Sequence, residues 1–517
     1  MRTCFYMDPL TVDPRKNGDL CSSTFLTMLY DGLTRFLPDG KVEFSLAQSV
    51  DISPDGKTYL FHLRKALWND GHPITAYDFE YSWKKSLDPK FSAACPQLFF
   101  PILNAEKSVN GTIDVEEVGV KAIDAGTFEV KLEHPTPYFL SLISCSNFYA
   151  IPKHIAETIS HWDATPTDNL VSSGPFKLVR WEKRKEICLT KNPLYWDAAN
   201  TTLPNLKISI INTEYSTLEM FENDELDWIS FTLSSLPLSA LKTYQQAGRL
   251  TLLPTGATSF CSFNTQKFPF TNQNIRKAFS LAIDRKKLTD EVSQLNEIPA
   301  SRCIPPILDG HTNHQILPPF SEKLARSYLQ KGLAELRIPY DDNDLRFRLF
   351  VNNLVLSYSE MQMSRSIAYA LQEQWRKVLG FTVKLLFHNY SAQMEHIMKN
   401  EHNIVLSIWI AQYNDPMNIL ERFKYRNLKK NYPGFENAEY IKILDSSFQK
   451  NSDKRESLLL EAEKLLLDQM PIAPLFHYNS AILSKPSVSG VEMSPFGGFQ
   501  FKYAKVQTNK KRLTVAC

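Results

Sequence analysis

The spacing of apolar residues along the chain predicts strands and helices that alternate over most of its length. Apolar residues at every second position predict a strand, and apolar residues three or four positions apart predict a helix. The expected strands are Arg2–Tyr6, Thr58–Leu63, two within Val118–Leu132, Phe176–Val179, Glu186–Leu189, Asn205–Ile211, Leu345–Val351 and Phe381–Phe387. The expected helices are Ser22–Leu33, one opened by the capping box Thr75-x-x-Asp78, Ile275–Ile283, Ser364–Leu379, Met417–Phe423 and Arg455–Asp468. This alternation predicts a mixed α/β fold.

Length and composition are those of a folded chain with several domains. At roughly 150 residues per domain, 517 residues correspond to about three and a half domains. The formal net charge of +2 gives no indication of a nucleic-acid partner. No apolar run approaches the roughly 18 residues that a membrane-spanning helix needs, since the longest, Ile404 to Ala411, has the length of a strand.

Cysteines and the N-terminus bear on the cellular compartment. The eight cysteines form no CxxC motif and no zinc-ribbon spacing, so we expect most of them to be free and buried. One or two disulfides stay open as an alternative if the protein is exported. Asp8-Pro9 interrupts the start of the chain before a signal peptide's apolar run could form, so we expect either a cytoplasmic protein or an export signal absent from this chain.

No motif of the common enzyme classes is present, because GxSxG, GxGxxG, P-loop and HExxH sequences are all missing. Ser82-Trp83-Lys84-Lys85 matches the SxxK of penicillin-recognising enzymes, but neither SDN nor KTG follows it. His311-x-x-His314 lies in a predicted loop without a third metal ligand, and His154 and His161 are interpreted as surface or packing residues. We therefore predict no catalytic residue, no metal and no cofactor.

The stretch from Trp409 to Pro416 is the most informative local feature. An apolar strand ends there in a polar, aromatic-rich turn of the kind that lines ligand clefts. Asp415-Pro416 also has a structural interpretation, because Asp is a favoured helix cap and Pro a favoured first helical residue.

These segments, taken in order, resemble the extracellular solute-binding proteins of bacterial peptide ABC importers, the oligopeptide-binding type of solute-binding protein family 5. The block from Trp68 to Phe79 is the most specific part of the resemblance. The other matching segments are Thr11–Arg15, Met28–Leu33, Tyr59–Arg64, Tyr81–Lys84, Thr136–Phe139, Ser173–Phe176, Asn192–Trp196, Phe263–Gln266, Ile275–Ala278, Tyr413–Pro416 and Pro474–Tyr478.

The resemblance implies a two-lobed α/β periplasmic-binding-protein fold of the class II type with an additional α/β domain. The implied domains are lobe I (residues 1–30, 156–256 and 480–517), the additional domain packed on it (31–155) and lobe II (257–479). Members work in the periplasm or on the outer face of the cytoplasmic membrane, so we expect an export signal to have been removed, and lipoprotein anchoring is an open alternative.

The function that the resemblance implies is non-catalytic. An extended oligopeptide is enclosed between the lobes, with its backbone paired to protein strands, and the closed complex is presented to ABC permease subunits in the inner membrane. We expect a monomer with no nucleic-acid partner. The alternatives are a binding protein specialised for cell-wall (murein) or N-terminally blocked peptides, and a sensor that passes a signal peptide to a receptor.

Binding residues are carried over by position. The strand Ile408-Trp409-Ile410 and the segment Asp19-Leu20-Cys21 are expected to flank the peptide backbone, with Ala411, Tyr413, Asn414 and Asp415 beside them. The family typically has an Asp where this sequence has Gln412, and that carboxylate pairs with the peptide's α-amino group. A buried ammonium without a counter-charge is costly, which motivates the blocked-peptide alternative. Arg365 is the candidate for binding the peptide's C-terminus.

Overall fold

The chain forms two compact units in a computed structural model, which describes residues 1–159, 161–164, 167–234, 236–308, 314–359, 362–448, 452–496 and 498–507. Unit 1 comprises Met1–Leu253, Gln412–Asn414 and Ser480–Cys517, and unit 2 comprises Pro254–Ala411 and Asp415–Asn479. The chain passes from one unit to the other within the long strands β12 (Leu250–Phe263) and β17 (Ile472–Ser484), and again on either side of residues 412–414.

Unit 1 contains two four-stranded sheets and several short strand pairs. Its α-helices are α1 (Leu20–Leu29), α2 (Ala76–Leu87), α3 (Ala105–Val109), α4 (Phe139–Leu142), α5 (Lys153–Ala156), α6 (Glu214–Glu222) and α7 (Leu238–Gln246). Its sheet strands are β1 (Arg2–Phe5), β4 (Ala47–Ile52), β5 (Thr58–Leu63), β6 (Val120–Ala122), β7 (Thr127–Lys131), β8 (Phe176–Glu182), β9 (Glu186–Lys191) and β10 (Asn205–Ile210). The other strands are β2 (Thr34–Phe36), β3 (Val42–Phe44), β11 (Trp228–Ser230), β18 (Val488–Ser489), β19 (Glu492–Met493), β20 (Phe499–Gln500) and β21 (Lys505–Val506).

The first sheet of unit 1 has the strand order β1-β10-β9-β8. β1 pairs parallel to β10, and the remaining pairs are antiparallel. Helix α1 packs against β8, where the Phe25 ring meets the Trp181 ring edge-on with centroids 5.4 Å apart. The burial of these rings anchors α1 to the sheet.

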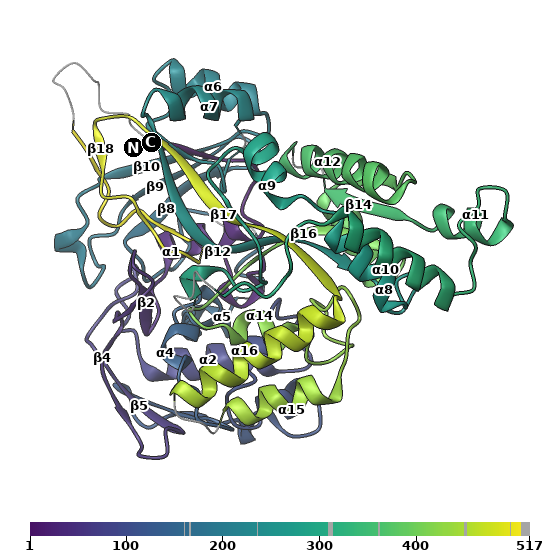
Figure 1. The fold of residues 1–517 in the computed structure, drawn as a ribbon. Coiled ribbons are helices and arrows are strands. Elements are labelled where there is room, and N and C mark those ends of the chain that lie inside the picture. The colour runs from purple at the N-terminus through teal and green to yellow at the C-terminus, as the bar shows by residue number, and fades with distance from the viewer. Residues whose placement is uncertain are drawn as a thin grey trace. The chain divides into compact units, whose positions relative to one another are not determined.

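The second sheet of unit 1 has the order β4-β5-β7-β6, and α2 packs against it (Figure 1). Helix α2 begins at the predicted capping box, where the Asp78 carboxylate accepts from the Thr75 backbone N–H at 2.8 Å and from its hydroxyl at 2.9 Å. The Trp83 ring meets the Phe128 ring edge-on at 5.1 Å. Ser82, the serine of the SxxK match, is buried there and donates to the Tyr149 carbonyl.

Unit 2 is built on a seven-stranded sheet in the order β11-β17-β12-β16-β14-β15, with β13 paired to β17. Of this sheet, β11 and the residues of β17 with which it pairs belong to unit 1. The strands not yet bounded are β13 (Ile298–Pro299), β14 (Val355–Ser359), β15 (Lys384–His388) and β16 (Ile404–Ile410). The α-helices are α8 (Gln273–Leu281), α9 (Arg285–Lys287), α10 (Glu322–Glu335), α11 (Leu345–Asn352), α12 (Gln362–Leu379), α13 (Tyr390–Met398), α14 (Met417–Leu420), α15 (Ala438–Ser447) and α16 (Ser452–Gln469).

Helix α10 lies beside α8 in unit 2 (Figure 1). The approach requires Gly332 of α10, because a Cβ there would come within 2.7 Å of the Ile275 side chain. Helix α12 packs on α8 through the fully buried Trp375, whose indole N–H donates to the Phe279 carbonyl at 3.0 Å.

One expected element has the wrong type, and the bounds of several others differ in the structure. The prediction of a strand over Leu345–Val351 is wrong, because this segment is helix α11. Asp344 caps the helix by accepting from the Arg346 backbone N–H, and the buried Phe347 and Phe350 lie three positions apart. Helix α1 begins at Leu20, before Ser22, because the Asp19 carboxylate caps its N-terminus, and it ends at Leu29, where the backbone of Tyr30 is extended.

The predicted division into three domains stays a prediction. The chain leaves unit 1 after Leu253, three residues before the expected crossing after residue 256, and it re-enters unit 1 at Ser480. Residues 31–155 belong to unit 1 and are not separated from it. The brief return to unit 1 at Gln412–Asn414 is absent from the prediction.

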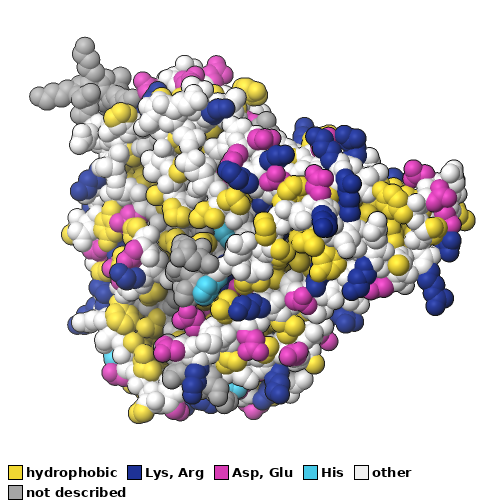
Figure 2. Space-filling view, in the orientation of Figure 1, with side chains coloured by type: hydrophobic (Ala, Val, Ile, Leu, Met, Phe, Trp, Pro, Cys, Tyr) yellow, Lys and Arg dark blue, Asp and Glu magenta, His cyan; other side chains and the backbone are white. Residues whose placement is uncertain are grey.

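The cysteine prediction is confirmed for the described residues: Cys4, Cys21, Cys95, Cys145, Cys188, Cys261 and Cys303 are free and buried. Cys517 and His311 lie outside those residues. Among the described helices, none has the length and apolar character needed to cross a bilayer. On the face drawn in Figure 2, basic side chains are interspersed with acidic ones, in keeping with the small net charge.

Candidate functional site

Strand β16 has strand partners on both sides at its start but on one side at its end. It pairs antiparallel with β12 from Phe263–Ile404 to Ala257–Ile410. Its parallel pairing with β14 covers Ile404 and Val405. In the described part of the chain, Ser407–Ile410 therefore have β12 as their one strand partner, which leaves a strand edge of the kind that pairs with an extended peptide.

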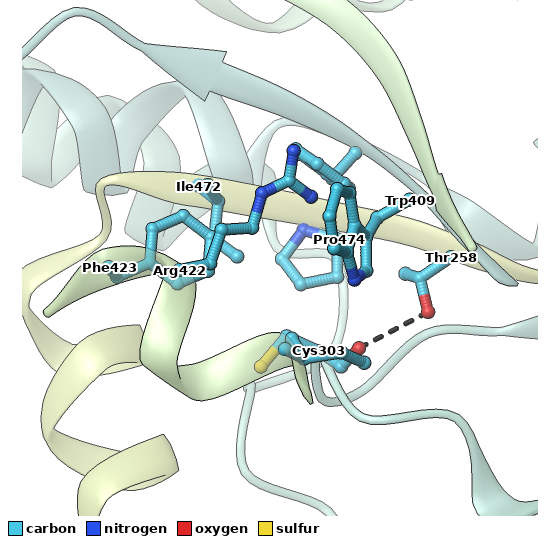
Figure 3. Close-up of a pocket in the computed structure, with 9 residues that line it drawn as sticks. Thr258, Cys303, Trp409, Arg422, Phe423, Ile472 and Pro474 are labelled. Atoms are coloured by element: carbon cyan, nitrogen blue, oxygen red, sulfur yellow. Dashed lines mark hydrogen bonds between the residues drawn. The ribbon is translucent and has the colours of Figure 1, made fainter. Parts of the chain in front are cut away.

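A pocket of unit 2 lies on one face of this strand pair (Figure 3). Trp409 and Thr258 are register partners and line it together. Helix α14 and the following 3-10 turn, η8 (Glu421–Phe423), contribute Arg422. The remaining lining residues are Phe260, Cys303, Ile419, Phe423, Ile472 and Pro474.

Arg422 is the charged residue of this pocket. Its guanidinium carbon lies 3.3 Å from the centroid of the Trp409 ring, and Figure 3 shows the two groups against each other. Its Nε donates to the Lys430 carbonyl at 2.9 Å, whereas Nη1 is buried without a hydrogen-bond partner among the described residues. Burial lowers the pKa of Arg422 to about 9, so the group stays charged at neutral pH.

One wall of the pocket is held by Thr258. Its hydroxyl donates to the Cys303 carbonyl at 3.1 Å (Figure 3). The same oxygen lies 2.8 Å from His477 Nδ1, so it accepts from the Nδ1–H of that imidazole. Burial lowers the pKa of His477 to about 3, which keeps the ring neutral.

The loop that carries Cys303 is fixed from α16. The Glu463 carboxylate accepts from the backbone N–H groups of Cys303 and Ile304, at 2.8 and 3.0 Å. It also pairs with the Arg302 guanidinium at 2.6 Å, and both side chains are buried. This pair is charge-assisted and has several hydrogen bonds, so it sets the position of the pocket wall.

Asp415 has the structural role that its sequence context suggests. Its Oδ1 accepts from the Met417 backbone N–H at 2.8 Å, where α14 begins. Both of its oxygens accept from the Arg455 guanidinium, at 2.7 and 2.9 Å. The carboxylate is therefore committed to a helix start and a buried ion pair, which argues against a role as the anchor for a ligand's amino group.

Gln412, Tyr413 and Asn414 belong to unit 1. The Gln412 carbonyl lies 3.0 Å from the Cys145 thiol, which donates to it. The Tyr413 ring stacks on Tyr138 with centroids 4.9 Å apart and an interplanar angle of 9°. The Asn414 backbone N–H donates to the Ser141 hydroxyl at 2.9 Å. These contacts hold the three-residue segment tightly within its unit.

The segment Asp19-Leu20-Cys21, which is expected to flank the peptide backbone, lies at the start of helix α1. Asp19 caps α1, with its carboxylate accepting from the Ser22 N–H at 2.9 Å and from the Ser22 hydroxyl. Leu20 and Cys21 form the first turn of that helix. The Cys21 thiol is fully buried, and burial raises its pKa well above the usual range.

Arg365 lies in unit 2 on helix α12 and is exposed. Its guanidinium carbon lies 5.6 Å from the centroid of the Phe387 ring on β15. Arg365 is outside the pocket that contains Arg422, so these two arginines present separate positive charges.

Among the predicted residues, the structure places Trp409 in the pocket, but Arg422 and Thr258 were absent from the sequence prediction. A signal for Arg422 exists in the sequence. It is a basic residue in the predicted helix Met417–Phe423, directly after the aromatic-rich turn and next to the apolar Phe423.

Comparison with known proteins shows the same family. The model of bacterial extracellular solute-binding proteins, family 5 Middle, matches residues 41–431. The oligopeptide-binding protein OppA of Bacillus subtilis is 33% identical over 501 residues, which cover 96% of this chain and 91% of the relative.

Two solved structures share the fold. The murein tripeptide binding protein MppA of Escherichia coli has a TM-score of 0.87 at 27% identity, covering 98% of each chain. The oligopeptide-binding protein OppAIV of Borrelia burgdorferi has a TM-score of 0.88 at 29% identity, covering 98% of this chain and 99% of the other. The expected two-lobed α/β fold class is thereby confirmed. The chain belongs to the bacterial extracellular solute-binding proteins of family 5.

Proposed function

We propose that the protein is the peptide-binding component of an ABC-type importer, which binds an extended oligopeptide and delivers it to permease subunits in the inner membrane. Membership of family 5 and likeness to oligopeptide-binding proteins over nearly the whole chain support this function. The role is one of binding rather than catalysis. The protein works as a monomer in the periplasm or on the outer face of the cytoplasmic membrane.

The observation that carries the proposal is the edge of β16 next to the Trp409–Arg422 pocket. A peptide added to this edge gains main-chain hydrogen bonds that do not depend on its sequence. Alternate side chains of an extended peptide point to one face, and the pocket lies on one face of the β12–β16 pair. The two features together supply affinity from the backbone and selectivity from one side chain.

Arg422 defines the chemistry of that selectivity. Among the described residues, the Nη1 of the buried Arg422 guanidinium has no hydrogen-bond partner, and a carboxylate is a natural counter-ion for such a group. The proposed ligand therefore presents a carboxylate to Arg422, either an acidic side chain or the C-terminus. The pocket has a free volume of about 10 Å³, room for roughly one water molecule, so its lining side chains have to move apart for the carboxylate to reach the guanidinium. The indole N–H of Trp409 is likewise buried without a hydrogen-bond partner among the described residues, so it is a second donor available to such a group.

The first experiment identifies what the protein carries. Native mass spectrometry of the purified protein, followed by denaturation and sequencing of the released ligand, should yield peptides enriched in Asp or Glu. The second experiment is a thermal-shift screen with matched three- to five-residue peptides that differ by Glu or Gln at one position. A protein that released no peptide and was stabilised by none of these peptides would contradict the proposal.

A second candidate ligand is a cell-wall (murein) or N-terminally blocked peptide. Two observations favour it: Gln412 stands where the family typically has an Asp, and MppA is a murein tripeptide binding protein. Calorimetry with a free and an N-acetylated form of one acidic peptide separates the two candidates. Equal affinity for both forms favours the blocked ligand, and a strong preference for the free amine favours the general peptide.

A further inference from the structure

A group of metal-ligating side chains lies in unit 1, outside the candidate peptide site, and it includes His154, which the sequence analysis interprets as a surface or packing residue. Asp70, His72 and His154 each offer one ligand atom, and these atoms all lie within 4.8 Å of one another. The Asp70 Oδ2 atom lies 3.1 Å from His72 Nδ1 and 2.7 Å from His154 Nε2. In the described part of the chain, no second group of three such side chains comes this close together.

We propose that Asp70, His72 and His154 bind one divalent transition-metal ion of the zinc type, with solvent completing the coordination. Two imidazole nitrogens and one carboxylate oxygen are a common ligand set for such ions. Ligand atoms about 2.0–2.2 Å from a tetrahedral ion lie roughly 3.3 Å from each other. The observed 3.1 and 2.7 Å separations therefore need to open by about 0.2 and 0.6 Å, and the two imidazole nitrogens, which lie within 4.8 Å of each other, have to reach the same separation.

The turn that carries Asp70 and His72 is fixed before any ion binds. The Asp70 Oδ1 atom accepts from the His72 backbone N–H at 3.0 Å, which leaves Oδ2 directed at the two imidazoles. The Trp68 backbone N–H donates to the His72 carbonyl at 2.8 Å and closes the turn. Gly71 has a φ of +92°, which a residue with a side chain adopts only with strain.

The segment with His154 is fixed independently. His154 lies on α5, whose first residue, Lys153, donates its backbone N–H to the Asp78 carboxylate at 3.1 Å. Asp78 in turn belongs to the capping box of α2. The His72 and His154 rings stack with centroids 4.2 Å apart and 27° between their planes, so both present a nitrogen to the same oxygen.

Hydrogen bonding explains the arrangement of Asp70, His72 and His154 less well than metal binding does. One carboxylate oxygen would accept from both imidazoles at an exposed surface, where such pairs are weak. A bound ion instead releases the protons from those two nitrogens and joins the turn to α5 across the sequence. The same three atoms thus serve as hydrogen-bonded groups without the ion and as ligands with it.

Calorimetry of the metal-free protein with ZnCl₂ at pH 7.5 tests the proposal. We expect one saturable zinc ion per chain, with affinity reduced at least tenfold in His72→Ala, in His154→Ala and in Asp70→Asn, whose remaining oxygen can still accept from the turn N–H. His62→Ala is the matched control, because His62 pairs with a single carboxylate, that of Asp51, on the same unit. Millimolar MgCl₂ should not compete, since imidazole ligands disfavour this hard ion.

A second readout separates binding from folding. Zinc should raise the melting temperature of the wild type and of His62→Ala but not that of His154→Ala, while circular dichroism without zinc is the same for all three. Binding should also weaken between pH 7.5 and pH 5.5, because protons compete for the imidazoles. Absence of a saturable site, or a site that keeps its affinity in His72→Ala and His154→Ala, would overturn the proposal.

Discussion

At the scale of single residues, buried arginines of unit 2 show two ways of placing a guanidinium in the interior. Arg276 donates to the backbone carbonyls of Gln469, Met470, Phe270 and Thr271. Burial lowers its pKa to about 10, but its donors are satisfied. Arg422 donates to the Lys430 carbonyl and lies near the rings of Trp409 and Tyr432, and its Nη1 has no hydrogen-bond partner among the described residues. The first arrangement stabilises the fold, and the second retains a capacity to bind an anion.

Arg422→Met is therefore expected to separate binding from stability. Affinity for a peptide with a Glu side chain should fall at least tenfold, on the order of 1.4 kcal/mol, while affinity for the Gln analogue changes little. The unfolding free energy should stay the same or rise, because an apolar side chain replaces a buried unpaired charge. Calorimetry with the Glu and Gln peptides and urea denaturation measure the two effects.

Arg276→Met is the matched control for that variant. It should lower the unfolding free energy by about 1–3 kcal/mol because several buried carbonyls lose their donor. It should leave the preference for Glu over Gln peptides unchanged. Loss of that preference in Arg276→Met, or its retention in Arg422→Met, would show that Arg422 does not hold the carboxylate.

Gln412→Asp is expected to sharpen recognition of a free peptide N-terminus by tenfold or more, about 1.4 kcal/mol. An amide accepts a hydrogen bond from an ammonium but cannot neutralise it, whereas a carboxylate does both. Asp415 is not available for this purpose, because it is bound to Arg455 and to the Met417 N–H. Calorimetry with a free and an N-acetylated peptide pair measures the change. A wild type that already discriminates strongly would mean that another group anchors the amine.

At the scale of elements, the pocket depends on where α16 holds the loop that carries Cys303. Glu463→Gln should lower the unfolding free energy by about 3–5 kcal/mol, because it leaves Arg302 buried with a neutral partner. Since Cys303 lines the pocket, peptide affinity should fall as well. Urea denaturation and calorimetry check both effects.

Glu373→Gln on α12 is the control for this element. Glu373 forms exposed ion pairs with Arg376 and Lys377, so its loss should change stability by less than about 1 kcal/mol. Equal destabilisation by the two substitutions would show that the buried pair contributes no more than an exposed one.

At the scale of the whole molecule, the protein should lose stability in acid because unit 2 buries neutral histidines. His402 donates through Nε2 to the Tyr432 carbonyl at 2.8 Å, and burial lowers its pKa to about 4. In the unfolded chain His402 binds a proton near pH 6.5, whereas in the folded protein it does so only near pH 4. The neutral His402 therefore costs no stability above pH 6.5. As the pH falls from 6.5 toward 4, the unfolding free energy decreases by a total of about 3 kcal/mol.

Urea denaturation at a series of pH values between 7 and 4.5 measures this loss. In His402→Gln the unfolding free energy should decline less steeply with falling pH than in the wild type. The decline that remains is assigned to His477, because burial lowers its pKa to about 3. His62→Gln, a change at a partly exposed histidine of unit 1, should follow the wild type. Identical slopes in all three proteins would contradict the assignment to His402.

The sequence by itself determined the features that depend on neighbours along the chain. The capping box Thr75–Asp78 needs only residues three apart, and the alternation in Thr58–Leu63 matches β5 without any change of bounds. The ordered motifs of the family are also short local patterns, and they are sufficient to indicate the fold class from the sequence. The predicted strand at Leu345–Val351 is wrong because the apolar residues there fit both an alternating and a helical spacing. The structure buries Phe347 and Phe350, three positions apart, on one face of a helix.

Only the tertiary structure decided which distant side chains meet. The sequence allows two interpretations of Asp415, a ligand contact or a helix cap. In the structure its carboxylate forms an ion pair with Arg455, forty residues away. The anion-binding capacity of Arg422 follows from two tertiary facts: its guanidinium lies against the Trp409 ring, and its Nη1 has no hydrogen-bond partner among the described residues. Asp70 and His154 are separated by more than eighty residues and still share a hydrogen bond. Burial and electrostatic pairing act through space, so sequence patterns alone do not specify them.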